Sequence, residues 1–210
     1  MSASKGVTRA LLLDVATALT LLSALVYLAG WTYAYHYFGQ FKLGLLMLDI
    51  PTHYYFMYGF WVFKAWVWIV IAVYLLLLLP FPLDESYLLG WLRKLKVTPF
   101  LQRNLEVLLI VLAFWLSWWL AVTSAASYYQ TQQQKGFIDY PNIRVWLKSP
   151  APNDAGLQAL YQALPQGGYR LLLQNEDKLF LLKPPQDGKP ARIAVTQLAL
   201  SEVRALRVLP

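Results

Sequence analysis

The stretch YGFWVFKAWVWIV, residues 58–70, is aromatic or aliphatic at almost every position, and Lys64 is its one charged residue. It lies inside a longer apolar run, residues 54–79, which is followed by Pro80. A helix of roughly 20 apolar residues is needed to cross a bilayer core about 30 Å thick. Because the run is long enough to do so, we interpret it as a membrane span and predict an α-helical membrane protein.

Two other segments, residues 10–33 and 103–126, are similar to it in length and character. The chain of 210 residues is 58% hydrophobic and only 14% charged, whereas a soluble domain carries about 25% charged residues. A cleaved signal peptide is the alternative interpretation of the first segment, but its apolar run exceeds the roughly 7–15 residues of such a peptide. The sequence therefore predicts three transmembrane helices.

Positive charges set the expected orientation of these spans. They are concentrated in the N-terminal tail and in the loop between the second and third spans: Lys5, Arg9, Arg93, Lys94 and Lys96. The loop between the first and second spans holds only Lys42. Because loops rich in lysine and arginine stay in the cytoplasm, we expect a multi-pass protein of the bacterial inner (plasma) membrane. Its N-terminal tail, residues 1–9, is expected in the cytoplasm and its C-terminal domain in the periplasm.

The segment SYLLGWLRKLKV, residues 86–97, has leucines at helical spacing on one side and the cations Arg93, Lys94 and Lys96 on the other. This pattern is typical of an amphipathic helix that lies in the headgroup layer. We therefore predict that the three cations bind the surface of the lipid bilayer. The net charge of the whole chain is +7, but no dense basic run of the kind that binds nucleic acid is present, so we expect no nucleic-acid partner.

The composition changes after residue 140, where alternating apolar residues and turn signals begin. Strands are predicted at residues 143–148, 169–174, 179–183, 192–197 and 203–209. A helix is predicted at residues 153–164, with Asn153 or Asp154 as its N-cap. The order β-α-β-β-β-β predicts a small α+β domain, residues 141–210, with a mainly antiparallel sheet. The glutamine-rich residues 127–140 are interpreted as a stalk or linker.

A domain of this size buries a small core and is marginally stable by itself. The chain contains no cysteine, so no disulfide supports the domain. The same absence excludes cysteine-ligated zinc and thiol nucleophiles. We therefore expect the domain to pack on the membrane region, on a second copy of the chain or on a partner protein.

Lys64 is the first candidate functional residue, because an ionisable side chain inside a span is costly unless it has a use. At a rise of about 1.5 Å per residue, Ser23 and Ser117 lie at about the same height in the membrane as Lys64. Asp49, in the loop between the first two spans, is the nearest candidate counter-charge. We predict an intramembrane polar layer made of these four residues. The alternative is that Lys64 extends its ammonium group to the interface, beside neighbouring tryptophans.

His36 and His53 flank the same loop and are weak candidates for metal or haem ligands. Both stand among tyrosines, as residues at a membrane interface do, so we expect no metal site and no bound cofactor. A search for hydrolase and nucleotide-binding motifs finds only SASK, residues 2–5, which matches S-x-x-K in a short tail with no fold around it. We therefore expect no catalytic residues and no enzyme activity.

These features favour a non-catalytic binding or accessory protein of the inner membrane, such as an immunity protein or a subunit of a larger complex. Its periplasmic domain would engage a protein partner, and a strand edge at residues 143–148 or 203–209 would accept a partner's strand. One alternative is a small homo-oligomeric channel or membrane effector gated by the outer domain, although the second span lacks a polar stripe. Another is a haem- or quinone-linked membrane subunit.

Overall fold

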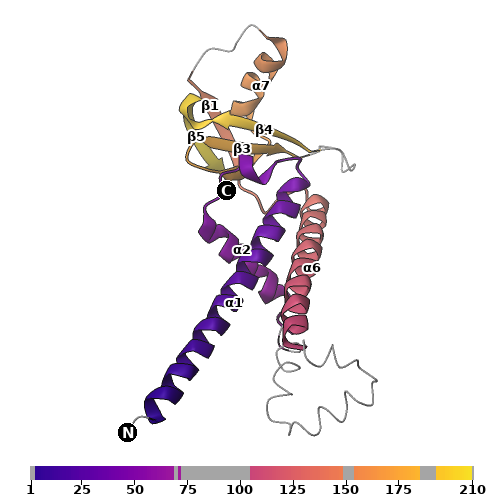
Figure 1. Ribbon diagram of the computed structural model, residues 1–210. Helices are drawn as coiled ribbons and strands as arrows, with labels where there is room; N and C mark the ends of the chain where they lie inside the picture. The colour runs from indigo at the N-terminus through magenta and orange to yellow at the C-terminus, as the bar shows by residue number, and fades with distance from the viewer. Residues whose placement is uncertain (1–2, 69–70, 72–104, 149–153, 185–192, 210) are drawn as a thin grey trace. The chain divides into compact units, whose positions relative to one another are not determined.

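The structure is a computed structural model that describes residues 3–68, 71, 105–148, 154–184 and 193–209 (Figure 1). The chain forms two compact units. The first comprises Met1–His36 and Pro51–Ala125, and we call it the helical unit. The second comprises Tyr37–Ile50 and Ala126–Pro210, and we call it the sheet unit.

Two long helices lie where the first and third spans were predicted. They are α1, Ala3–Gly39, and α6, Leu105–Gln134. Within them, Ala16–Gly39 and Ile110–Gln134 are long and apolar enough to cross a membrane, with mean hydropathies of 1.3 and 1.6. These two segments are the candidate spans in the part of the chain that the structure describes.

The helix α2, Thr52–Ala65, forms the first half of the second predicted span. It ends at Trp66, whose φ of −112° and ψ of 25° are not helical, whereas the sequence predicts an uninterrupted helix. Residues 69–70 and 72–104 lie outside the described residues. They include most of the remainder of that span and the amphipathic helix predicted at 86–97, so a third transmembrane helix and the lipid-binding role of Arg93, Lys94 and Lys96 stay predictions.

The helices α1 and α2 approach each other backbone to backbone at Gly30 and Gly59. A Cβ added to Gly30 would overlap the carbonyl oxygen of Tyr55, and one added to Gly59 would overlap the carbonyl oxygen of Val26. Because these neighbours are backbone atoms, no side chain can move aside to make room. Small residues at a crossing allow membrane helices to pack this closely, and here only glycine fits.

The sheet unit contains one antiparallel sheet of five strands in the order β4-β3-β2-β1-β5 (Figure 1). The elements are β1 (Asn142–Leu147), α7 (Ala155–Gln166), β2 (Tyr169–Gln174), β3 (Lys178–Lys183), β4 (Ala194–Ala199), the 3-10 helix η2 (Leu200–Glu202) and β5 (Val203–Leu209). The predicted order β-α-β-β-β-β and the antiparallel sheet are confirmed.

The helix α7 covers one face of this sheet. It begins after Asp154, whose Oδ1 accepts a hydrogen bond from the backbone N–H of Leu157 at 2.9 Å, so Asp154 is the N-cap. Leu164 of α7 is buried in a core with residues from four of the strands. These buried partners are Ile143, Val145, Tyr169, Leu179, Leu181 and Leu198.

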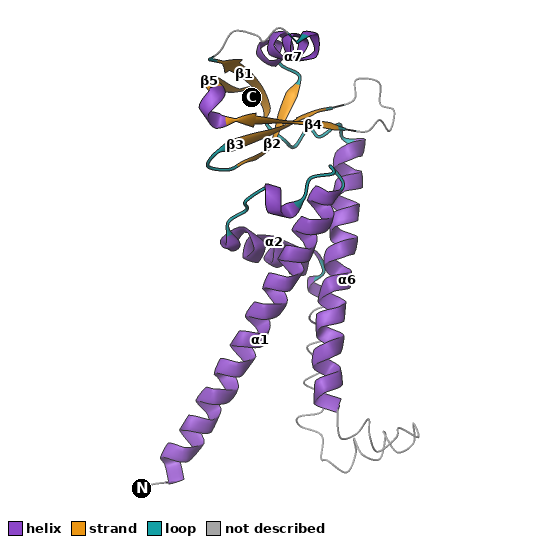
Figure 2. Cartoon of the chain, turned by 45° about the horizontal axis from the view of Figure 1, so that its top comes forward, coloured by secondary structure: helices purple, strands orange, loops and turns teal. Residues whose placement is uncertain are grey.

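The opposite face of the sheet is covered at its centre by residues 37–50. All four residues from Leu179 to Leu182 of β3 are buried, and strand alternation places Phe180 and Leu182 on the face away from α7. Residues 37–50, with the 3-10 helix η1 (Leu45–Met47), lie on that side of the sheet (Figures 1 and 2). Leu48 is fully buried there. The compact unit is thus larger than the domain predicted at residues 141–210.

Candidate functional site

The four residues of the predicted polar layer have different surroundings. Ser117 of α6 is buried, whereas Ser23 of α1 and Lys64 of α2 are exposed. The one ion pair in the described part of the chain joins two other residues, so Lys64 has no carboxylate beside it there. Asp49 belongs to the sheet unit and has a φ of +45°, a conformation that aspartate adopts more readily than most residues. A turn role therefore accounts for Asp49, and the polar layer stays a prediction.

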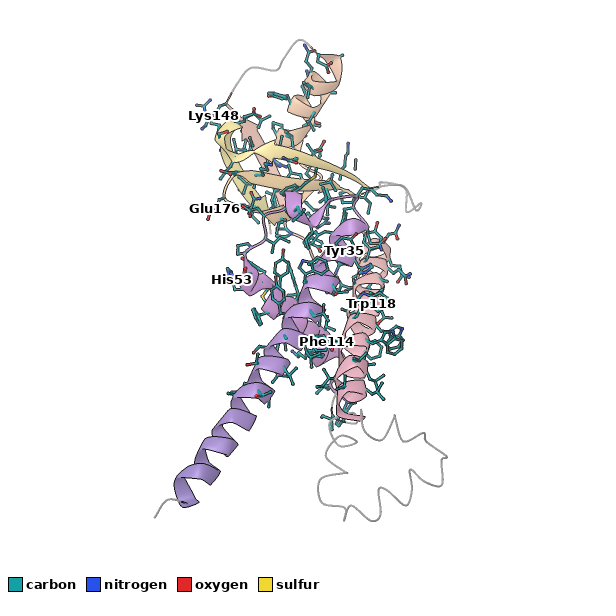
Figure 3. The ribbon with its side chains drawn as sticks, viewed as in Figure 1. Tyr35, His53, Phe114, Trp118, Lys148 and Glu176 are labelled. Carbon is teal, nitrogen blue, oxygen red and sulfur yellow. The ribbon has the colours of Figure 1, made fainter. Side chains whose placement is uncertain are left out.

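The two histidines contact aromatic rings. His36 lies edge-on to Tyr35 with ring centroids 5.4 Å apart, and His53 lies against Tyr54 with centroids 4.6 Å apart. Figure 3 labels Tyr35 and His53. Across the described ranges, no group of three His, Asp or Glu residues is close enough to hold a metal ion.

A polar contact that the sequence did not predict joins α2 to α6. The indole N–H of Trp66 donates a hydrogen bond to Oγ of Ser124 at 2.7 Å, and the ring of Trp66 lies 6.4 Å from that of Trp119. Since a polar atom in apolar surroundings needs a partner, this bond holds Trp66 in place where α2 ends. No local pattern in the sequence pairs residues so far apart in the chain.

One face of α6 is built from small residues. Ser117, Ala121 and Ala125 are buried and four residues apart, so they share a helix face. Trp118, on another face, is exposed and projects from the helix (Figure 3). This spacing is visible in the sequence, and together with Gly30 and Gly59 it could have identified the packing faces of the helical unit.

A polar cluster lies where α6 ends. Gln132 is fully buried, and its Nε2 donates a hydrogen bond to Oδ2 of Asp139 at 2.6 Å. Nζ of Lys135 lies 3.4 Å from the same oxygen. The hydrogen bond from Gln132, and secondarily the nearby Lys135, hold the pKa of the Asp139 carboxyl below its ordinary value. The cluster fixes the turn that leads from α6 to β1.

The turn itself places an aromatic side chain in an unusual backbone conformation. Phe137 has a φ of +58° and is fully buried. Its ring contacts those of Phe41, Tyr129 and Tyr140, with centroids 5.8, 6.0 and 6.2 Å away. A left-handed conformation is rare for a bulky residue, so the burial of the ring has to offset its cost.

Of the two strands predicted to lie at an edge of the sheet, one is an edge strand and the other is not. The prediction of an edge at residues 143–148 is wrong, because β1 pairs with both β2 and β5. Residues 203–209 form β5, which is an edge strand as predicted, and β4 is the other edge. Strand order depends on which segments pair over long distances, which the alternation within a single strand does not reveal.

Positive charge collects on β5 and its neighbour. Arg204 and Arg207 are exposed, and Arg207 lies directly opposite Arg144 of β1 in the strand register. Like charges in directly opposite positions are unfavourable. An anionic group placed beside them would relieve that repulsion.

The chain matches no protein-family model, and no curated protein or solved structure matches it. Its class therefore rests on its own features. Within the residues that the structure describes, it has two helices long and apolar enough to span a membrane, together with a separate unit built on a five-stranded antiparallel sheet.

Proposed function

We propose that this protein is a non-catalytic binding protein of the bacterial inner membrane, whose sheet unit recruits a partner protein through the edge of β5. The observation that carries the proposal is the position of β5, a seven-residue strand that pairs with β1 on one side only. The centre of the sheet is covered on both faces within its own unit. An edge strand offers backbone donors and acceptors to a further strand, and strand addition is a common mode of recruitment.

The positive charge on β5 would make its edge selective for the kind of strand that can pair with it. Arg204 and Arg207 would repel a second copy of the same strand, which protects the edge from self-association. A partner strand with aspartate or glutamate would instead neutralise them, and the opposed pair of Arg144 and Arg207 would gain most. The partner we propose is therefore a protein with an acidic, extended segment, as an immunity protein's target or a neighbouring subunit of a complex could provide.

The composition of α1 and α6 supports anchoring in a membrane. In an 18-residue stretch of each candidate span only 22% of the residues are buried inside the structure, whereas the core helix of a soluble protein is mostly buried. Exposed apolar surface of this extent is favourable against lipid. We propose three spans, with the N-terminus in the cytoplasm and the sheet unit in the periplasm.

The number of spans decides on which side of the membrane the two ends lie. With three spans the termini are on opposite sides, and with two they are on the same side. Alkaline phosphatase fused after residue 210 should be active, and the same enzyme fused before residue 1 should be inactive. Equal activity from both fusions would contradict three spans.

The partner can be tested with two adjacent proline substitutions, Arg207→Pro and Val208→Pro. Successive residues of an edge strand direct their N–H groups alternately toward the sheet and away from it, so only one of the two variants removes a hydrogen bond to β1. The full-length protein would be purified with its partners in mild detergent, and the partners identified by mass spectrometry.

One of the two variants keeps its hydrogen bonds to β1, so its unfolding midpoint should stay near that of the unaltered protein. The proposal predicts that a distinct partner co-purifies with the unaltered protein and is lost from this variant. A partner that both variants retain would exclude β5 as the docking site. A homo-oligomer with nothing else bound, seen by native mass measurement, would instead favour the channel hypothesis. Lys64 would then be the first residue to substitute.

A further inference from the structure

A cavity of about 330 Å³ lies in the sheet unit where α7 ends and β2 begins. Its polar lining residues come from β1, the end of α7, β2 and β3: Asn142, Gln166, Gly167, Gly168, Arg170 and Lys183. None of the described residues that line it is acidic. The cavity, which Ala163 and Pro184 also line, therefore carries positive charge, and an anionic ligand suits it better than an uncharged one.

Arg170 is held in a fixed position in this lining. One of its terminal guanidinium nitrogens, Nη1, donates hydrogen bonds to the carbonyl oxygens of Tyr140 at 2.8 Å and Ile138 at 3.2 Å. Both acceptors are neutral, and within the described ranges no carboxylate lies at ion-pair distance from Arg170. Its positive charge is thus placed but not neutralised, and a guanidinium has further donors beyond these two.

Lys183 supplies a second placed cation. Its Nζ lies 5.7 Å from the centroid of the Tyr169 ring, within the range of a cation–π contact. Tyr169 is buried in the core, so the ring is a fixed platform. A third cation is close by, because Nε of Arg144 lies 3.4 Å from the position that a Cβ on Gly167 would occupy.

Asn142 adds an unsatisfied acceptor to the same lining. Its side-chain Oδ1 is buried and has no hydrogen-bond partner in the structure. Buried polar atoms in proteins are almost always paired, and an exception calls for an explanation. A ligand hydroxyl that donates a hydrogen bond would provide the missing partner.

We propose that this cavity binds a phosphoryl group carried on a small hydroxylated molecule. Asn142 and Arg170 lie opposite each other in the strand register, so they share one face of the sheet. On that face the phosphoryl oxygens would accept hydrogen bonds from Arg170, and a hydroxyl of the carrier would donate to Asn142. Lys183, which lies beside Tyr169 on the α7 face, would attract the anion without contacting it. Arginine and lysine together are suited to a group with several negatively charged oxygens. The same chemistry occurs in the headgroup of phosphatidylglycerol and in soluble glycerol phosphate.

The competing explanation is purely structural, because cations near the C-terminus of α7 also stabilise the helix dipole. Binding and stability therefore have to be measured separately. The full-length protein in neutral detergent would be titrated calorimetrically with glycerol 1-phosphate and with dihexanoyl-phosphatidylglycerol below its micelle concentration. Glycerol and dihexanoyl-phosphatidylcholine serve as controls, since the first lacks the phosphoryl group and the second lacks the hydroxyls.

Three variants identify the contributing residues. Lys183→Gln should weaken binding several-fold, because it removes a positive charge that attracts the anion through space. Lys178→Gln, at the other end of the same strand, is the matched control and should bind as the unaltered protein does. Asn142→Ala should also weaken binding while leaving the unfolding midpoint unchanged or higher, because it removes an unpaired buried acceptor rather than a hydrogen bond.

Saturable binding of either phosphoryl compound, weakened by Lys183→Gln but not by Lys178→Gln, supports the proposal. The compound that binds more tightly shows whether the natural ligand is a lipid headgroup or a soluble phosphate. No saturable binding of either compound would overturn it. So would equal binding of dihexanoyl-phosphatidylcholine, or a loss of stability in Asn142→Ala, which would show that the asparagine has a structural partner.

Discussion

Gly30 and Gly59 meet where α1 crosses α2, and a Cβ on Gly30 would lie 2.7 Å from the backbone nitrogen of Gly59. Substitution of either glycine with alanine must push the helices apart, because the obstructing atoms are backbone. We expect Gly30→Ala and Gly59→Ala each to lower the free energy of unfolding by about 1–3 kcal/mol, the usual cost of overpacking.

The unfolding midpoint of the purified protein, followed by circular dichroism in detergent, measures this effect. Gly39→Ala is the control, because no atom lies within 4 Å of an added Cβ there. Alanine is also the better helix former, so this control should be neutral or slightly stabilising. A loss at Gly30 no larger than that at Gly39 would mean that the two helices do not cross as described.

Phe137 combines a left-handed backbone with a fully buried ring, so its side chain has to contribute more than the backbone conformation costs. We expect Phe137→Ala to lower the free energy of unfolding by about 3–5 kcal/mol, as for other buried phenylalanines. The neighbouring Ile138 is 64% exposed, and Ile138→Ala should change the stability of the sheet unit little. Chemical denaturation with a near-ultraviolet signal compares the two, and similar losses would argue against an anchoring role for Phe137.

Asn175 performs two separate tasks in the sheet unit. Its Oδ1 accepts hydrogen bonds from the backbone N–H groups of Lys178 at 2.7 Å and Asp177 at 3.1 Å, which shapes the turn between β2 and β3. Its Nδ2 donates to the carbonyl oxygen of Leu48 at 3.0 Å and so ties down residues 37–50. Asn175→Asp keeps the first task and loses the second, whereas Asn175→Ala loses both.

We therefore expect Asn175→Asp to cost about 1–3 kcal/mol, the range for a buried group left without its partner, and Asn175→Ala to cost more. Hydrogen exchange should rise in residues 45–50 of both variants. In Asn175→Asp the turn between β2 and β3 should stay protected. The exposed neighbour Glu176, which Figure 3 labels, gives the control Glu176→Ala. Unchanged exchange near Leu48 in Asn175→Asp would rule out the described bond.

Asp139 gives the sheet unit a defined response to acid. Because its folded-state pKa lies below the ordinary value of 3.8, its contribution to stability is present above that value and is lost as the pH falls through the lowered pKa. The unfolding midpoint should therefore fall with acidification in this range. Asp139→Asn should reduce the slope of the unfolding midpoint against pH. Gln132→Leu removes the largest cause of the lowered pKa and should reduce it as well. Slopes equal to that of the unaltered protein would contradict the assigned hydrogen bond.

The elements of the sheet unit were predictable because their signals are local. Alternating residues mark each strand, and Asp154 directly precedes the helix that it caps. The cover provided by residues 37–50 was not predictable, since Leu48 and Asn175 are far apart in the chain and no short pattern connects them. The turn at Trp66 was missed for the opposite reason, because the surrounding residues are uniformly apolar and give no local stop signal.

The candidate sites show the same division. The rise of an α-helix per residue gives the height of Ser23, Lys64 and Ser117 in a membrane. It does not give the rotation of each helix about its axis. That rotation depends on packing between helices, and it leaves Ser117 buried and the other two exposed. The cavity beside α7 depends on four elements meeting in space, so its residues have no common pattern in the sequence.

The sheet unit is discontinuous, and this has a consequence for how the cell makes it. Residues 37–50 leave the ribosome long before β3 exists. The strand β1 cannot pair with β5 until the end of synthesis, because β5 is the last strand to be made. The apolar surface of Leu48 therefore has no partner during most of translation, a period in which exposed apolar segments invite aggregation. For the same reason, a fragment of residues 141–210 produced alone should bare Phe180 and Leu182 and self-associate, so biochemical work on the sheet unit needs the N-terminal segment in the same chain.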